Sequence, residues 1–443
     1  MRIAIIGSGI AGLGSAWLLS REHEVTLYEA NAYLGGHTHT HEIVQAGRSY
    51  AIDSGFIVFN PQNYPLLTHL LNELGVASQP TTMSFAVRNE ASGLEYNATS
   101  LDTLFCQRRN LLSPRFIGMM RDIVRFYREA PALLEQDDDG AGPTLAEWLR
   151  DQRYGNAFRD EHLVPMASAL WSSPGSDILR FPIRYLIRFM ANHHMLQVLD
   201  RPRWRVVQGG SQRYVDALRA QWTVDERIAC PVQRVQRHAR GVCISSAAGN
   251  EEFDQVVLAC HSNQALALLA DADAREQSIL GAIGYQTNEA VLHTDARLLP
   301  RQRKAWAAWN VLLPKQAEES RMVTYCMNLL QSLDSAEPFC VSLNSSHRID
   351  PSRVLRRMRY AHPVYDHVSV SARARKGEIQ GQRKTWYAGA YWGFGFHEDG
   401  LRSATEIAHA LGIHWPLQAV PATALQNASS QRINHDAQRV SAS

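Results

Sequence analysis

Three glycines near the start of the chain have the spacing of a turn that binds phosphate groups. Gly7, Gly9 and Gly12 follow the apolar stretch 2–6 and open a second apolar stretch of helical character. Gly7 permits a tight turn, Gly9 has no Cβ to keep a pyrophosphate from the backbone, and Gly12 lets a helix lie close to a sheet. The helix N-terminus then offers free N–H groups and a partial positive charge. The pattern predicts a dinucleotide site.

An acidic residue, Glu29, comes twenty residues after Gly9, directly after another apolar, strand-like stretch, 25–28. In a strand–turn–helix–strand unit, a carboxylate at the position of Glu29 accepts a hydrogen bond from the ribose 2′-hydroxyl. The same carboxylate disfavours a 2′-phosphate, so NADP is not expected. Strand, turn, helix and acid agree in order and spacing, which makes an ordinary glycine-rich turn the weaker interpretation.

A second block with chemical meaning lies near the C-terminus. A strand-like stretch ends at Ala388 and Gly389, a loop of aromatic residues and glycines follows, and Gly400 is expected to open a helix. The N-terminus of such a helix can stabilise negative charge on a bound group. A glycine-rich connector before a terminal helix is the alternative interpretation.

Together the two blocks resemble the FAD-binding amine-oxidase-like flavoproteins, which include protoporphyrinogen-oxidase-type and phytoene-desaturase-type enzymes. Gly35 and Gly36 resemble the double glycine of their extended N-terminal signature, and His37 stands where the class usually has arginine. Ala390 stands where the class often has an acid. The resemblance implies FAD as cofactor, with the helix at Gly400 facing the pyrimidine edge of the flavin. No metal is expected, because the cysteines and histidines lack the spacing of metal ligands.

The expected cofactor contacts follow from this resemblance, residue by residue. The segment at Gly55 would run past the flavin ring, although a plain turn has equal weight there, and Val232 would contact the adenine. The full set is Gly7, Ser8, Gly9, Ile10, Ala11, Gly12, Glu29, Ala30, Gly36, His37, Thr38, Gly55, Phe56, Val232, Gly389, Gly400 and Leu401.

Further segments resemble one subgroup of this class. These are 163–172, 192–196, 204–211, 306–310, 325–331 and 361–363. The subgroup consists of predicted NAD/FAD-binding oxidoreductases that accompany, or are fused to, cyclopropane-fatty-acyl-phospholipid synthases. The resemblance therefore implies association with such a synthase, and desaturation of acyl chains is one role proposed within the subgroup.

These motifs require an α/β fold: a Rossmann-like FAD-binding domain of the amine-oxidase (GR2) type, with an α+β substrate domain inserted. Residues 66–200 favour helices, including an amphipathic stretch at 114–134 and a capping box from Thr144 to Glu147. The expected FAD-binding domain is discontinuous and comprises residues 1–65, 201–279 and 381–415. The expected substrate domain has a helical part, 66–200, and a sheet part, 280–380. Residues 416–443 are expected to form a polar tail.

The composition excludes several classes of protein. A net charge of +2 gives no support for nucleic-acid binding, and no apolar run is long enough to span a membrane. The nucleotide-binding strand begins at Arg2, which leaves no room for a cleaved signal peptide, so a cytoplasmic location is expected. Six scattered cysteines without a CxxC pattern indicate free thiols, without disulfides or metal ligands.

A basic aromatic stretch at 180–190 carries arginines every four residues, on one face of an expected helix. Such a helix, with Arg184 and Arg188 outward, could rest on the inner face of an anionic membrane. A docked helix with a solvated arginine face is the more common interpretation.

Flavin accepts a hydride, so the protein must hold a C–H bond against it and exclude water. Amine oxidases of this class usually place a lysine near flavin N5, but only four of the 45 basic residues here are lysines, and none lies in a suitable stretch. His293, in a strand-rich region, is the candidate catalytic residue. His193 and His194 are alternatives, and a hydrogen-bonded core histidine remains the more common interpretation of all three.

The sequence thus predicts an FAD-dependent oxidoreductase that dehydrogenates or desaturates an apolar substrate, such as a phospholipid acyl chain, by hydride transfer to flavin N5. An amine oxidase is the alternative enzyme. A non-catalytic flavin- or lipid-binding partner of a lipid-modifying synthase is the alternative of another class. The substrate, the electron acceptor, the oligomeric state and covalent attachment of the flavin stay open.

Overall fold

The computed structural model describes residues 1–135, 142–171, 175–197, 201–316 and 321–415. The predicted polar tail, 416–443, and most of the acidic loop before Thr144 lie outside the described residues.

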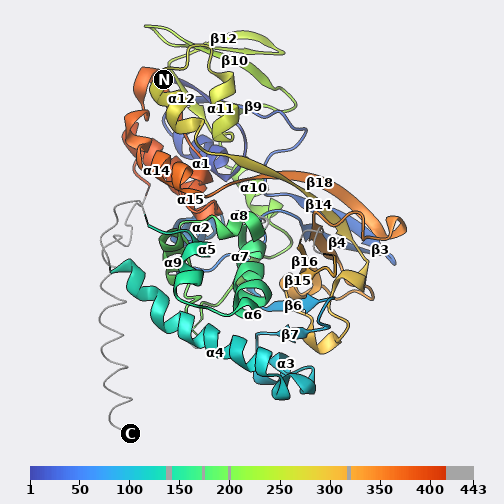
Figure 1. The fold of residues 1–443 in the computed structure, drawn as a ribbon. Helices are drawn as coiled ribbons and strands as arrows, with labels where there is room; N and C mark the ends of the chain where they lie inside the picture. Colours follow the sequence, from blue (N-terminus) through green and yellow to red (C-terminus); the bar gives the residue numbers. More distant parts are fainter. Residues whose placement is uncertain (136–141, 172–174, 198–200, 317–320, 416–443) are drawn as a thin grey trace, which may run out of the picture.

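A five-stranded parallel sheet forms the upper part of the molecule in Figure 1, where α1, α15 and the N-terminus lie together. Its order is β19 (Thr385–Tyr387), β13 (Gln255–Leu258), β1 (Arg2–Ile6), β2 (Glu24–Tyr28) and β9 (Val224–Arg227). Every neighbouring pair runs parallel. The central strands are continuously apolar because both faces of the sheet are covered.

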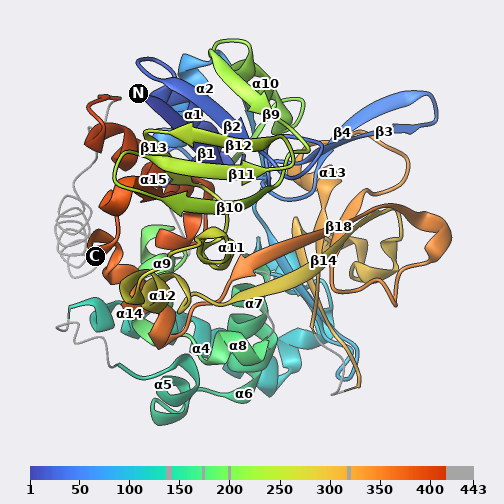
Figure 2. The same ribbon diagram turned by 90° about the horizontal axis from the view of Figure 1, so that it is seen from above.

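Alternate residues of β1 enter two different cores. Ile3 and Ile5 pack on the side of α1 (Ile10–Leu19), α10 (Gln212–Arg219) and α15 (His397–Ala410). Ala4 and Ile6 pack on the side of a three-stranded antiparallel sheet made of β10 (Val232–Arg237), β11 (Val242–Ser246) and β12 (Gly249–Phe253). Figure 2 shows this small sheet lying across the parallel one. The two-residue period of a strand explains the division.

Helix α1 is buried along its whole length because glycines let it approach neighbours on two sides. A Cβ on Gly12 would overlap the Gly7 carbonyl oxygen and lie 3.2 Å from the Ala259 Cβ. A Cβ on Gly14 would lie 2.7 Å from Leu401 Cδ1 of α15. The glycine motif therefore fits α1 between the sheet and the last helix.

A seven-stranded sheet forms the other half of the molecule. Its order is β18 (Val354–Pro363), β14 (Tyr285–His293), β17 (Cys340–Leu343), β16 (Met322–Cys326), β15 (Trp309–Leu313), β6 (Phe85–Asn89) and β7 (Glu95–Asn97). All neighbours are antiparallel except β6 and β15. The strands of each sheet come from the segments predicted for one domain, whose boundaries stay predictions.

Helices pack against this second sheet through one large core. They include α4 (Pro114–Glu129), α5 (Leu145–Asp151), α7 (Val164–Trp171) and α9 (Ile183–Asn192). Helix α2 (Pro65–Glu73) packs instead in the core of the parallel sheet. The capping box of Thr144 and Glu147 is present at the start of α5. Helix α4 ends five residues earlier than the periodicity predicts, and residues Ala130–Leu134 continue it as a 3₁₀ turn that contains Pro131.

The predicted arginine-rich helix exists as α9, but its apolar side is not free to lie on lipid. Leu186, Ile187 and Phe189 are fully buried in the core, whereas Arg188 is exposed. The docked-helix interpretation therefore fits α9. Within the described ranges no helix is long and apolar enough to cross a membrane.

All six cysteines lie in the described ranges and are free thiols, as predicted. The described residues contain no cluster of side chains that could hold a metal ion.

Candidate functional site

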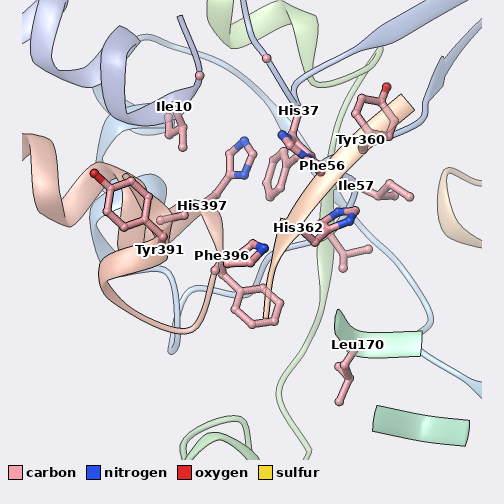
Figure 3. A pocket seen from close by; sticks show the side chains of 18 of the residues that line it. Ile10, His37, Phe56, Ile57, Leu170, Tyr360, His362, Tyr391, Phe396 and His397 are labelled. Carbon is pink, nitrogen blue, oxygen red and sulfur yellow. The ribbon is translucent and has the colours of Figure 1, made fainter. Parts of the chain in front are cut away.

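One cavity of about 1220 Å³ connects the two halves of the molecule. It starts at the turn between β1 and α1, passes between the two sheets, and ends among α7, α9 and β15. Figure 3 shows Ile10 and Leu170 on opposite sides of it, with histidine and aromatic side chains between them. Most ligand sites for one small molecule measure about 300–1000 Å³, so this cavity can take a dinucleotide together with a substrate.

The β1–α1 turn leaves space where a phosphate group would lie. A Cβ built on Gly9 meets no atom within 4 Å, and Gly9 lines the cavity. Ile10 and Ala11, in the first turn of α1, also line it, and that turn holds no acidic residue to oppose an anion. The helix N-terminus is therefore free to bind a pyrophosphate.

The acidic residue at the end of β2 lies at the same end of the cavity. Glu29 is buried, and its Oε2 accepts hydrogen bonds from the Ser8 N–H at 3.0 Å and from the Ser8 hydroxyl at 2.5 Å. Its Oε1 accepts from the backbone and side-chain N–H groups of Asn31 at 2.7 and 2.8 Å. These donors hold the carboxylate in the place predicted for a ribose contact.

Two buried polar atoms in the cavity wall have no hydrogen-bond partner among the described residues. They are His37 Nε2, directly after the double glycine, and the hydroxyl of Tyr391. Buried polar atoms are rarely left unpaired, so both are available to a bound polar group. Together with the open space at Gly9, they show that the residues present fit a dinucleotide such as FAD.

Most of the predicted cofactor residues line this cavity, and four do not. Those that line it are Gly7, Ser8, Gly9, Ile10, Ala11, Glu29, Ala30, Gly36, His37, Gly55, Phe56, Val232 and Gly389. Gly12 and Gly400 lie at helix contacts instead, and Leu401 is fully buried between α15 and α1. Thr38 lies behind the wall, where its hydroxyl bonds to Tyr214 and to His397 Nε2.

The last helix begins three residues before the predicted start. Helix α15 opens at His397, because the Asp399 carboxylate accepts hydrogen bonds from the N–H groups of Phe394 and Phe396 at 2.9 and 3.1 Å. The prediction that Gly400 opens the helix was wrong. Phe396 and His397, at the true N-terminus, line the cavity.

The structure does not place His293 at the cavity. Its side chain is fully buried in β14, where Nε2 bonds to the Ser342 hydroxyl at 2.8 Å and Nδ1 accepts from the Asp295 N–H at 3.0 Å. Both ring nitrogens are therefore used inside the seven-stranded sheet. The alternatives His193 and His194 do line the cavity.

Other histidines, from separate parts of the chain, meet in the middle of the cavity. The ring of His37 lies 5.2 Å from that of His362 and 6.2 Å from that of His261, and His397 stacks on Phe56 at 3.7 Å (Figure 3). Burial lowers the pKa of His261 and His362 to about 4 and that of His397 to about 3. These rings are neutral at pH 7, so they can donate and accept hydrogen bonds without adding charge.

A hydrogen-bond chain determines which nitrogen of His362 carries the proton. The Asn288 Oδ1 accepts from Asn344 at 2.7 Å, so the Asn288 amide nitrogen is the donor to His362 Nδ1 at 2.9 Å. The neutral ring then carries its proton on Nε2. His362 is therefore a hydrogen-bond donor in the cavity wall.

The far end of the cavity is apolar and aromatic. Its wall is made of Met83, Phe85, Tyr127, Met166, Leu170, Phe189, Trp309, Tyr325 and Leu343. Among the described lining residues, the acidic and basic side chains are Glu29 at the nucleotide end, Arg201 and Arg203. This chamber can hold an apolar group, and its described wall offers no carboxylate to an ammonium group.

Sequence reasoning missed His261, His362 and His397 as lining residues, and also Arg201 and Arg203. His362 lies in the segment 361–363, which carried part of the subgroup resemblance and could have been singled out. His397 lies in the C-terminal block between Gly389 and Gly400, which was singled out for other residues. No local pattern marked His261, Arg201 or Arg203, because they meet the other lining residues only in the folded chain.

Comparison with known proteins agrees with this site. Residues 10–343 match the family model described as "Flavin containing amine oxidoreductase". A Mycobacterium tuberculosis protein assigned as a flavin-containing monoamine oxidase is 26% identical over 266 residues, which cover 58% of this chain and 56% of that protein. Tryptophan 2-monooxygenase of Allorhizobium ampelinum is 39% identical over 77 residues, 17% of this chain and 10% of that enzyme. The chain thus spans little more than half of the first relative.

Solved structures share the fold. A fatty acid isomerase from P. acnes that produces CLA has a TM-score of 0.66 at 17% identity, over 93% of this chain and 99% of that one. Putrescine oxidase bound to putrescine has a TM-score of 0.67 at 14% identity, with the same coverage of 93% and 99%. These findings confirm the predicted fold class and the predicted FAD cofactor. The chain belongs to the flavin-containing amine oxidoreductase family.

Proposed function

We propose that this oxidoreductase dehydrogenates or desaturates an apolar substrate, and that an acyl chain of a phospholipid is the substrate class. The observation that carries the proposal is the chamber at the far end of the cavity, away from Gly9. It is lined by apolar and aromatic side chains, and burial of an apolar chain there is favourable by about 25 cal/mol per Å².

The charges around the cavity favour this substrate over an amine. Arg201 and Arg203 would repel an ammonium group and attract a carboxylate or phosphate, while Glu29 lies at the nucleotide end and is already hydrogen-bonded. The names of the curated relatives favour amine oxidation, which is the second candidate. A fatty acid isomerase with the same fold supports the view that this architecture can accommodate an acyl chain.

FAD supplies a hydride acceptor at flavin N5 when it is bound. The chain itself has three tasks. Gly9 and the first turn of α1 would hold the pyrophosphate, and His37 would offer a hydrogen bond nearby. The aromatic chamber would orient the substrate and exclude water. His362 would donate a hydrogen bond through Nε2, and the low pKa values of the histidines keep positive charge out of the site.

The partner of this enzyme remains a prediction from the sequence resemblance. Association with a cyclopropane-fatty-acyl-phospholipid synthase would be tested by co-purification of the two proteins. A non-catalytic flavoprotein that supports such a synthase is the remaining alternative, and it predicts that no lipid or amine reduces the flavin.

Anaerobic titration of the FAD-loaded protein separates these functions. Loss of flavin absorbance near 450 nm on addition of acyl phospholipids supports the proposal. Loss with primary amines alone supports an amine oxidase, and loss with neither supports the non-catalytic alternative.

A pair of variants tests whether lipid-dependent bleaching of the flavin requires the apolar chamber. Leu170→Arg places a cation in the chamber wall, whereas Leu329→Arg makes the same change at an exposed position in a different region. We expect lipid-dependent bleaching to be lost in the first variant and kept in the second, with FAD bound in both. Equal bleaching in the two variants would contradict the assignment of the substrate chamber.

A further inference from the structure

Exposed large apolar side chains gather on one part of the surface. The described residues contain nine of them, and five lie between residues 101 and 124, whereas the other four are scattered over the rest of the chain. The five are Leu101, Leu111, Leu112, Ile117 and Val124. Single exposed apolar residues are ordinary, but a cluster marks a surface that contacts another apolar phase.

This cluster lies on three consecutive elements at the lower edge of the molecule in Figure 1: α3 (Leu101–Leu104), the 3₁₀ turn Arg108–Leu112, and α4. We call their exposed side the α4 surface. Leu112 is 87% exposed and Val124 is 61% exposed, so these side chains have no cover in the described structure.

Helix α4 has two different faces. Ile117, Arg121, Val124 and Arg128 recur at intervals of four, three and four residues, which places them in one stripe along the helix. All four are exposed, while Phe116, Met119 and Phe126 are buried on the other side. The stripe alternates an apolar side chain with a cation, so it presents both kinds of side chain on the same exposed side of the helix.

The α4 surface also carries positive charge. Residues 101–129 contain six arginines and three acidic residues, a net charge of +3 in a chain whose total is +2. One of the acids, Asp122, is buried and accepts a hydrogen bond from the Gly155 N–H at 2.9 Å. Since the exposed excess is cationic, the surface is complementary to anionic lipid headgroups.

We propose that the α4 surface docks the enzyme on an anionic lipid bilayer, with its apolar side chains inserted at the level of the headgroups and its arginines against the phosphates. The inner side of the same helix supplies Tyr127 to the wall of the large cavity, next to Arg201. Docking through α4 therefore brings the cavity wall to the bilayer surface. The proposal concerns binding and does not require that the substrate be a lipid.

A second copy of the chain fits this surface less well. A two-fold contact through α4 would bring the stripe with Arg121 and Arg128 against the same stripe of the other copy. Like charges facing each other across an interface are unfavourable, whereas anionic lipid neutralises Arg121 and adds an anion beside Arg128, which also pairs with Glu129 at 3.4 Å.

The test is sedimentation of the FAD-loaded full chain with vesicles of phosphatidylcholine containing 30% phosphatidylglycerol, and with pure phosphatidylcholine vesicles. We expect binding to the anionic vesicles that weakens when NaCl is raised from 0.1 to 0.5 M, because salt screens the arginine–phosphate attraction. Vesicle binding is read without turnover, so the substrate assignment and this proposal can fail separately.

Two variants test the apolar and the cationic components, each with a matched control. Leu112→Ser/Val124→Ser removes two exposed apolar side chains, and Val44→Ser/Val368→Ser does the same elsewhere on the surface. Arg121→Gln/Arg128→Gln removes two charges, and Arg234→Gln/Arg240→Gln does the same on β10 and the turn after it. Each arginine near an anionic surface contributes about 1 kcal/mol, so we expect vesicle affinity to fall roughly 25-fold in the α4 arginine variant.

The apolar α4 variant should lose affinity by at least about tenfold, and both controls should bind like the wild type. All positions are exposed, and retained flavin absorbance and an unchanged Tm would verify folding. The proposal is overturned if the wild type does not sediment with anionic vesicles, or if α4 variants and controls bind equally. It is also overturned if the wild type is a dimer in light scattering that only the α4 variants dissociate.

Discussion

Replacing Gly9 by valine tests whether the open space at the β1–α1 turn belongs to the cofactor. The backbone at Gly9 has φ −64° and ψ 176°, which any residue can adopt, and a Cβ there meets nothing within 4 Å. The protein without cofactor should therefore fold normally, with a loss of less than about 1 kcal/mol from a poorer N-cap. The three added carbon atoms would occupy the space beside the first turn of α1.

The expected loss of FAD affinity follows from the hydrogen bonds that valine would block. A hydrogen bond from a backbone N–H to a charged group contributes about 1.5–3 kcal/mol. If two such bonds to the pyrophosphate are lost, binding weakens by about 3–6 kcal/mol, or roughly 10²- to 10⁴-fold. Titration of the cofactor-free protein with FAD, followed by flavin fluorescence, measures this change.

Gly12→Val is the contrasting variant in the same motif. Its side chain would overlap the Gly7 carbonyl oxygen, so this substitution should lower the Tm of the cofactor-free protein itself. A Gly9→Val protein that stays yellow with wild-type affinity would refute the assignment of the turn to the cofactor. A Gly9→Val protein that unfolds as readily as Gly12→Val would refute the argument from free space.

Other perturbations test the core and the histidine cluster. Arg237→Met leaves the buried Glu276 without its cation and should lower the free energy of unfolding by about 3–5 kcal/mol. The double variant Arg237→Met/Glu276→Met should recover much of that loss, as measured by urea unfolding. Equal losses in the two variants would contradict the pairing. His261 and His362 have pKa values lowered to about 4 in the folded state. Between pH 4 and 6.5 the folded state therefore binds fewer protons than the unfolded state. The stability that is present above pH 6.5 is lost as the pH falls through this range. At pH 5.5 the two should together cost about 3 kcal/mol relative to pH 7.5 in the cofactor-free protein. His261→Gln/His362→Gln should remove this part of the pH dependence, while other buried histidines with lowered pKa values, such as His193 and His293, keep theirs. An unchanged slope would contradict the contribution of His261 and His362.

The nucleotide-binding half of the site could be predicted because its determinants lie close together in the chain. The strand, the turn at Gly7 to Gly12, α1 and Glu29 fall within 29 consecutive residues, and their contacts are made by neighbouring elements. When all the contacts of a motif are short-range, the spacing of its residues in the sequence is enough to predict it. The same is true of the capping box at Thr144.

The two errors have different physical causes: a contact with another segment for His293 and an unusual local N-cap for α15. His293 looked like a catalytic candidate, but Ser342 of the neighbouring strand and the Asp295 backbone use both of its ring nitrogens. The start of α15 depends on Asp399 bonding back to Phe394, and Phe396 is not a residue that signals a helix start.

By itself, the sequence predicted a dinucleotide site at a strand–turn–helix unit, since glycine spacing and one acid mark such a site locally, and the family resemblance predicted FAD. The tertiary structure alone decided what else surrounds the cavity. His37, His261, His362 and His397 come from four separate segments, and only the packing of the two sheets brings them together. It also decided which helix keeps large apolar side chains in solvent: α9 buries them in the core, whereas α4 buries Phe116 and Met119 but leaves Ile117 and Val124 exposed. The physical reason is that burial depends on every element packed around a residue, whereas a turn depends only on its own few residues.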